Sequence, residues 1–280
     1  MTKKDTVRRQ FDSSVTRVAP VFAILEQRTD AWVAKVLDLA ARGLNAKHRP
    51  WIAEDMSPTL VDFAEKARGK RERGLRPPTS LLAWLLENVK NPDGRTLSTN
   101  PEVAQRRQRI LDRDPETMAE ALRALDQKGQ SSAWSRFEGP TYPDVVIETP
   151  DALVIVEGKR TERGPTTHTT WMKGRHQMLR HLDAAWEIRG GRSVYGIFVV
   201  EADPNVETKV PERWIQAAAE TLSDDVVKGS LPHRSTEEQA SIAAAFIGIT
   251  TWQAIVAEFG IDPGVIKNPD GTAGSQQSAR

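Results

Sequence analysis

The chain has 280 residues, of which 39% are hydrophobic and 28% charged, and it contains no cysteine. This composition is typical of soluble globular proteins, and the lack of cysteine excludes disulfides, thiolate metal sites and thiol nucleophiles. No segment approaches the roughly 18 consecutive apolar residues of a membrane helix, and no apolar stretch follows the basic first residues, as it would in a secretory signal. We therefore expect a cytoplasmic protein with no membrane partner.

The formal net charge of +1 conceals an asymmetry along the chain. Residues 1–132 contain 24 Lys and Arg against 18 Asp and Glu, whereas the remaining residues contain 15 against 20. A basic part joined to an acidic part is typical of a polyanion-binding region beside a carboxylate-bearing one, although solvated helix surfaces can produce the same difference. The basic segment 66–78 either contacts nucleic-acid phosphates or is a solvated linker.

Helical periodicity dominates the first 130 residues. The spacing of apolar residues and the capping residues predict helices over 14–45, 56–68 and 79–90, and two further helical pieces within 101–130. Residues 1–78 are therefore expected to form a helical N-terminal region that ends in a basic linker.

The apolar pattern changes period after residue 131. Strands are predicted over 132–138, 143–148 and 153–159, then a helix over 174–188 and a strand over 193–202 that is buried on both faces. Further helices are expected over 210–222, 235–248 and 250–260, followed by a disordered tail over 268–280. This organisation gives a core over 79–205 and a helical C-terminal region over 206–267.

The segment TYPDVVIETPDALVIVEGKR, residues 141–160, predicts a hairpin with charged side chains in its strands. A turn centred between residues 150 and 151 places Asp144 directly opposite Glu157, on the same face and with Cβ atoms about 4.5–5.5 Å apart. Carboxylates this close repel each other unless they share a proton or a cation. Hard oxygen ligands with no Cys or His nearby suit Mg²⁺ or Mn²⁺ rather than Zn²⁺.

Lys159 lies two residues beyond Glu157 on the same face of its strand, so its ammonium reaches the same site. A divalent metal, two carboxylates and a lysine suit the attack of water on a phosphodiester. The metal polarises the phosphate and lowers the pKa of its bound water, while the ammonium orients the water and meets the developing charge.

Pro143-Asp144, followed by Glu157-Gly158-Lys159 at the end of the next strand, resembles the signature of the PD-(D/E)xK nuclease superfamily. The resemblance covers about residues 79–205. It implies an α/β restriction-endonuclease-like fold, in which an αβββαβ core with a mixed central sheet is flanked here by helical N- and C-terminal regions. The matching pieces are the helix 79–90, the strands 132–138, 143–148 and 153–159, the helix 174–188 and the strand 193–202.

The resemblance also implies roles for particular residues. Asp144, Glu157 and the backbone carbonyl of Gly158 would ligate the metal, Lys159 would position the attacking water, and Glu87 in the first core helix would be a further ligand. As a plain alternative, Glu87 is a solvated helix residue.

Three residues of the following region are candidates for substrate binding. Gln177 matches the Gln of a Gln-x-x-x-Tyr motif found in some members, but His181 stands where the Tyr is expected, which argues against the exonuclease-like branch that uses the motif. Arg180 is a candidate phosphate contact. Trp171 could stack on a base or belong to the core.

The function expected from these residues is Mg²⁺-dependent hydrolysis of nucleic acid, with Mn²⁺ as a possible substitute. We expect a DNA endonuclease of the restriction or repair type, which could act as a homodimer. The alternatives are a non-cleaving nucleic-acid-binding or protein-interaction module on the same fold, and a helical interaction protein whose carboxylates are ordinary strand-end charges.

Overall fold

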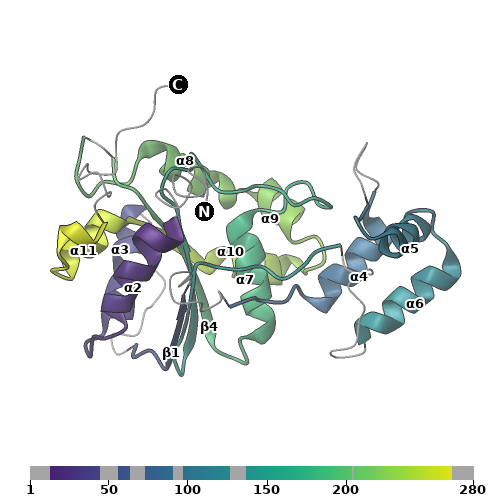
Figure 1. The fold of residues 1–280 in the computed structure, drawn as a ribbon, viewed down its shortest axis with the longest axis horizontal. Helices are drawn as coiled ribbons and strands as arrows, with labels where there is room; N and C mark the ends of the chain where they lie inside the picture. Colours follow the sequence, from purple (N-terminus) through teal and green to yellow (C-terminus); the bar gives the residue numbers. More distant parts are fainter. Residues whose placement is uncertain are drawn as a thin grey trace.

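A five-stranded mixed sheet forms the centre of the protein (Figure 1). The computed structural model describes residues 13–44, 56–63, 73–90, 97–126, 137–203 and 205–266. The strands follow one another across the sheet in chain order: β1 (Leu60–Phe63), β2 (Val145–Glu148), β3 (Ala152–Gly158), β4 (Ser193–Val200) and β5 (Phe246–Thr251). The β1–β2 and β2–β3 pairs are antiparallel, whereas the β3–β4 and β4–β5 pairs are parallel. The predicted α/β class and the mixed character of the sheet are confirmed.

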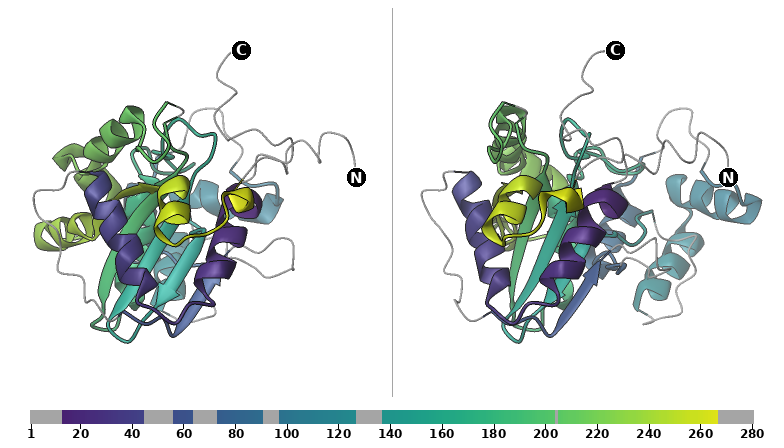
Figure 2. Two further views of the ribbon diagram at one scale, coloured as in Figure 1. Left: turned by 90° about the vertical axis from the view of Figure 1, so that its left-hand side faces the viewer. Right: turned by 60° about the vertical axis from the view of Figure 1, so that its left-hand side comes forward.

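Different helices cover the two faces of the sheet (Figures 1 and 2). Side chains of β2 alternate between the two apolar cores: Val145 and Ile147 belong to one, and Val146 to the other. The first core is completed by η1 (Ser14–Val18), α2 (Ala19–Leu25), α3 (Trp32–Gly43), α11 (Trp252–Glu258) and η4 (Pro263–Ile266). The second is completed by α7 (Gln177–Ile188), α8 (Glu212–Thr221), α9 (Asp224–Ser230) and α10 (Thr236–Ala244).

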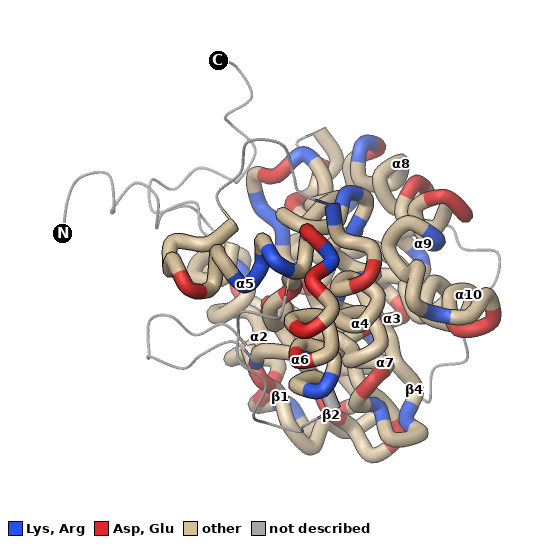
Figure 3. The backbone as a smooth tube through the Cα atoms, turned by 90° about the vertical axis from the view of Figure 1, so that its right-hand side faces the viewer, with Lys and Arg blue, Asp and Glu red and all other residues tan. Residues whose placement is uncertain are grey.

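A separate group of three helices lies at one end of the molecule (Figure 1). These helices are α4 (Thr79–Asn88), α5 (Pro101–Leu111) and α6 (Pro115–Asp126). Their buried side chains, such as Leu85, Ile110 and Ala121, form a third apolar cluster. Basic and acidic residues are interspersed along α5 and α6 (Figure 3). Among the described residues, no helix combines the length and the apolar character needed to cross a lipid bilayer.

The first helix and strand of the core differ from those predicted. The helix expected over 79–90 forms as α4, but its apolar side packs on α6 and not on the sheet. The strand beside β2 is β1, which lies in the segment 56–68 that was expected to be helical. Of the strand expected over 132–138, residues 132–136 lie outside the described residues, and Phe137 and Glu138 belong to no strand. The predicted boundary at residue 78 therefore separates β1 from the sheet that it completes.

The C-terminal region contributes a strand that was predicted as helix. Residues 246–251 form β5, whereas helices had been expected over 235–248 and 250–260. Gly248, with a φ of +157°, permits close packing against α3, since an added Cβ would lie 2.1 Å from the carbonyl oxygen of Ala40. Gly43 is equally constrained, because its Cβ would lie 1.9 Å from the carbonyl oxygen of Ile249. The predicted tail over 268–280 and the basic residues 66–72 lie outside the described residues.

Candidate active site

The hairpin of β2 and β3 has the register predicted from the sequence. Val145 pairs with Val156, and Ile147 pairs with Val154, so the next position outward sets Asp144 against Glu157. Both carboxylates are buried, with 8% of Asp144 and 4% of Glu157 exposed. The structure thus brings the two predicted carboxylates together at one end of the sheet.

Asp144 is held by two hydrogen bonds from segments that are distant in sequence. Its Oδ2 accepts from the backbone N–H of Gly158 at 2.9 Å, and its Oδ1 accepts from the Oγ of Ser14, also at 2.9 Å. Ser14 begins η1, which packs on β3 where the side chain of Val18 meets the Cα position of Gly158. Ser14 had no sequence motif to mark it, and only the fold brings it to the site.

Glu157 is surrounded by three polar side chains. Its Oε1 accepts from Nε2 of Gln177 at 2.6 Å and lies 2.9 Å from Nζ of Lys159. Its Oε2 lies 3.1 Å from Nε2 of His181, at ion-pair distance but without hydrogen-bond alignment. Nδ1 of His181 lies 2.7 Å from Oγ1 of Thr141. Gln177 and His181 are four residues apart on α7 and therefore present the same helix face, a spacing by which the sequence could have identified His181 as a site residue.

The two carboxylates have opposite electrostatic environments. Burial, together with the charge of Glu157, raises the pKa of Asp144 to about 8, so this carboxyl is mainly protonated at pH 7. Burial alone would raise the pKa of Glu157, but the adjacent His181 ring and the charge of Lys159 outweigh it and lower the pKa. For Lys159, the charge of Glu157 outweighs burial and raises the pKa, so this amine stays protonated.

A second buried charge pair fixes η1 at the same end of the sheet. Arg17, fully buried in η1, donates from Nε to Oε1 of Glu201, a residue that directly follows β4. The other oxygen of Glu201 accepts from Nε2 of Gln253 at 2.6 Å. Because Ser14 lies three residues before Arg17 in the same short helix, this pair also positions the hydroxyl that binds Asp144.

The donor set near Asp144 suits a hard divalent cation. The backbone N–H of Gly158 faces Asp144, and the N–H and C=O of one strand residue point to the same side, so its carbonyl oxygen is directed there as well. Among the described residues no three His, Cys, Asp or Glu side chains are grouped as metal ligands. The protein therefore offers two carboxylates and one backbone carbonyl. That incomplete oxygen set suits Mg²⁺, which usually keeps several waters. A cation would also favour the ionised form of Asp144, which burial and the charge of Glu157 disfavour.

The remaining predicted site residues lie apart from the carboxylates or are engaged elsewhere. Glu87, expected to be a further metal ligand, is exposed on α4, in the helical group at the end of the molecule (Figure 1). Arg180 donates to Oε1 of Glu138 at 3.2 Å and to the carbonyl oxygen of Gly139 at 3.0 Å. Trp171 is half-buried, with its ring edge-to-face on Phe137 at a centroid distance of 4.9 Å. Through these contacts Arg180 joins α7 to residues 138 and 139, and Trp171 packs against the apolar cluster of the α4–α6 group.

Comparison with protein-family models, with curated proteins and with solved structures finds no match to this chain.

Proposed function

We propose that the protein hydrolyses phosphodiester bonds in nucleic acid with the help of Mg²⁺ and acts as a DNA endonuclease. The observation that carries the proposal is the position of Asp144, Glu157 and Lys159 at one end of a single hairpin, with the carboxylates in opposed register. This juxtaposition matches the arrangement implied by the PD-(D/E)xK resemblance. We also propose that the sheet and its helices form the αβββαβ core. In this assignment η1, α2 and α3 take the place of the first helix, and β1 takes the place of the first strand.

The roles of the side chains follow from their protonation and contacts. Lys159 remains an ammonium and lies 2.9 Å from Glu157, so it can donate a hydrogen bond to a water and stabilise negative charge on phosphate oxygens, but it cannot accept the proton of that water. Gln177 and His181 hold Glu157 in place from α7. When bound, a divalent metal would supply Lewis acidity and a water of lowered pKa.

A non-cleaving binding module on the same fold is the second candidate, and the charge balance of the site favours it. Lys159 and His181 already surround Glu157, and Asp144 carries a proton at pH 7, so the buried site needs no cation to be stable. The two candidates differ in their response to metal. A catalytic site gains melting temperature with Mg²⁺ or Mn²⁺ by ligand linkage, whereas a site that binds no metal gains none.

The test is a cleavage assay on single-stranded and double-stranded DNA and RNA, each with Mg²⁺, Mn²⁺ or EDTA. The proposal predicts metal-dependent cleavage that Lys159→Ala reduces by at least about 100-fold, a loss typical of removing a charge-stabilising group. Lys90→Ala, which removes an exposed lysine at the end of α4, is the matched control and should cleave normally. Equal cleavage by Lys159→Ala, or undiminished cleavage in EDTA, would rule the proposal out.

A further inference from the structure

Tyr142 is an exposed ring within a buried segment. Every other residue from 141 to 147 is buried, including Thr141 and Pro143 on either side of it, whereas 53% of Tyr142 is exposed. Among the described residues, no other large hydrophobic side chain is as exposed. A single exposed apolar side chain is common on protein surfaces, so what Tyr142 can do depends on what holds its ring and what lies beside it.

The ring is held by the backbone of a neighbouring segment. Thr141 and Leu75 exchange backbone hydrogen bonds of 2.8 and 2.9 Å in an isolated antiparallel bridge. The adjacent pair sets Tyr142 opposite Gly74, where an added Cβ would lie 2.9 Å from Cε1 of the ring. The ring therefore packs directly on Gly74, and this contact orients it before any partner binds.

The exposed ring lies close to the candidate active site. Tyr142 precedes Asp144 by two residues, so their Cα atoms are at most about 7 Å apart. Oγ1 of the adjacent Thr141 lies 2.7 Å from Nδ1 of His181, and Nε2 of the same imidazole lies 3.1 Å from Oε2 of Glu157. A group bound on Tyr142 would thus lie beside the two carboxylates.

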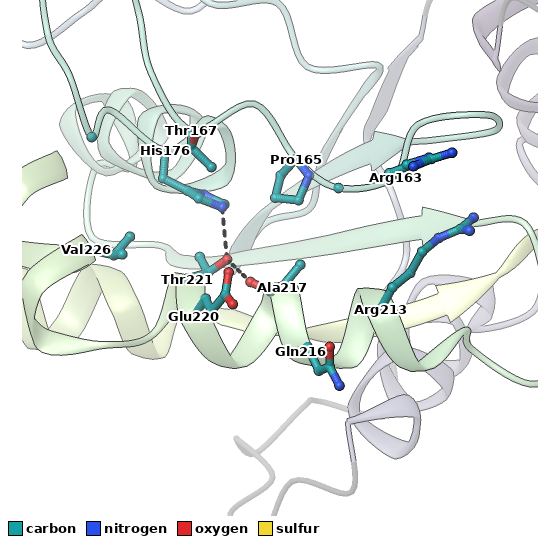
Figure 4. Close-up of a pocket in the computed structure, with 12 residues that line it drawn as sticks. Arg163, Pro165, Thr167, His176, Arg213, Gln216, Ala217, Glu220, Thr221 and Val226 are labelled. Carbon is teal, nitrogen blue, oxygen red and sulfur yellow. Dashed lines mark hydrogen bonds between the residues drawn. The ribbon is translucent and has the colours of Figure 1, made fainter.

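The helix that carries His181 is itself anchored at its start (Figure 4). Nε2 of His176, the residue before α7, lies 2.9 Å from Oγ1 of Thr221, and that hydroxyl donates to the carbonyl of Ala217 within α8 at 2.8 Å. The backbone N–H of His176 donates to Oγ of Ser230 at 3.0 Å. The frame behind Tyr142 is therefore fixed by the fold, and so is the position of the ring relative to the site.

An arginine accompanies the ring on the same side of the bridge. Arg76 is exposed and lies two residues beyond Gly74, so in extended backbone it shares a face with Gly74 and is the diagonal neighbour of Tyr142. Pro77, which follows Arg76, favours that extended backbone. Proteins that bind unpaired nucleic-acid strands combine such elements, with an aromatic ring under a base and a cation near the phosphates.

We propose that Tyr142 stacks on a base next to the scissile phosphate, and that the protein therefore acts on single-stranded or locally unpaired DNA in preference to intact duplex. A base within a duplex is stacked between its neighbours, so a protein ring can stack on it only when it is unpaired or flipped out. Such stacking is tolerant of sequence because every base has a flat π-face. The inference rests on the proposed function and extends it by naming the class of substrate.

The test is fluorescence anisotropy in EDTA, with a short labelled single strand and a blunt duplex of the same sequence. The native protein should bind the single strand at least about tenfold more tightly than the duplex. Tyr142→Leu, which keeps an apolar side chain but no ring, should weaken single-strand binding at least about fivefold, whereas Tyr142→Phe should stay within about twofold. Leu222→Ala, which removes an exposed apolar side chain after α8, is the matched control and should also stay within about twofold. Because Tyr142→Phe keeps the packing on Gly74, it separates the ring's contribution from that of the hydroxyl, and melting temperatures show whether each variant is folded.

The inference is overturned if the duplex binds as tightly as the single strand, or if Tyr142→Leu binds the single strand as the native protein does. An equal loss on both substrates would overturn it as well. Single-strand binding that depends on Tyr142, without cleavage in Mg²⁺, would leave the base contact assigned and refute the hydrolytic function. Metal-dependent cleavage of duplex that Tyr142→Leu leaves unchanged would do the reverse.

Discussion

Replacing Asp144 by Asn should stabilise the metal-free protein. The pKa of Asp144 is raised from 3.8 to about 8 because folding buries the carboxyl beside Glu157. At pH 7 the unfolded chain gains from ionising this group, and the folded chain does not. A pH of 7 lies roughly 3 units above the pKa of this carboxyl in the unfolded chain, and each unit corresponds to about 1.4 kcal/mol. The native fold is therefore destabilised by about 4 kcal/mol relative to the unfolded chain. Asn is neutral and nearly isosteric, and its Oδ1 can accept from the N–H of Gly158 while its Nδ2 donates to Oγ of Ser14, so it removes this cost.

The sign of the pH dependence follows from the raised pKa. The contribution of Asp144 to stability is fully present below pH 4 and is lost as the pH rises from about 4 to 8. Denaturant unfolding in EDTA, followed by tryptophan fluorescence, should give a stability difference between Asp144→Asn and the native protein that grows from about 2 kcal/mol at pH 5 to about 4 kcal/mol at pH 7 and about 5.5 kcal/mol at pH 8.5. Glu87→Gln is the control and should follow the native curve. An Asn variant no more stable than the native protein at pH 7 would refute the reasoning.

Three further predictions concern the site and the fold. Glu157→Gln should reduce metal-dependent cleavage at least about 100-fold, while Glu87→Gln, an equal change on exposed α4, should stay within twofold in the same assay. Gly43→Ala should lower the free energy of unfolding by about 2–4 kcal/mol, because the new methyl would meet the carbonyl of Ile249; equal denaturation midpoints would contradict this. Burial would raise the pKa of Asp183, but its basic partners lower it to about 2, so this carboxylate should contribute about 2 kcal/mol to the free energy of unfolding. That contribution is lost as the pH falls from about 4 to 2, and acid titration of Asp183→Asn should lack the loss.

The hairpin could be predicted from sequence because its information is local. The alternation of apolar residues along 143–148 and 153–159 fixes which side chains share a face, and the turn fixes the register that opposes Asp144 to Glu157. The position of Lys159 on the same strand face as Glu157 follows from the same alternation. The spacing of Gln177 and His181 places them on one helix face, so their common contact with Glu157 could also have been predicted from the sequence.

The rest of the site depends on contacts between distant segments. Ser14 reaches Asp144 across 130 positions, and Arg17 reaches Glu201 across 184 positions, through a fold that single-sequence patterns do not specify. Glu87 was predicted as a ligand because α4 is the amphipathic helix just before the predicted strands. Its leucines, however, are buried against α5 and α6. The short apolar run of β5 fits a helix or a strand equally well, and only its pairing with β4 decides between them.

The proposed function requires Asp144, Glu157 and the carbonyl of Gly158 to hold a divalent cation together. The most direct measurement is anomalous diffraction from crystals of the full chain soaked in Mn²⁺. We expect an anomalous peak bonded to both carboxylates, which disappears in Asp144→Asn. Mn²⁺ bound only elsewhere, or a peak that persists unchanged in Asp144→Asn, would contradict it.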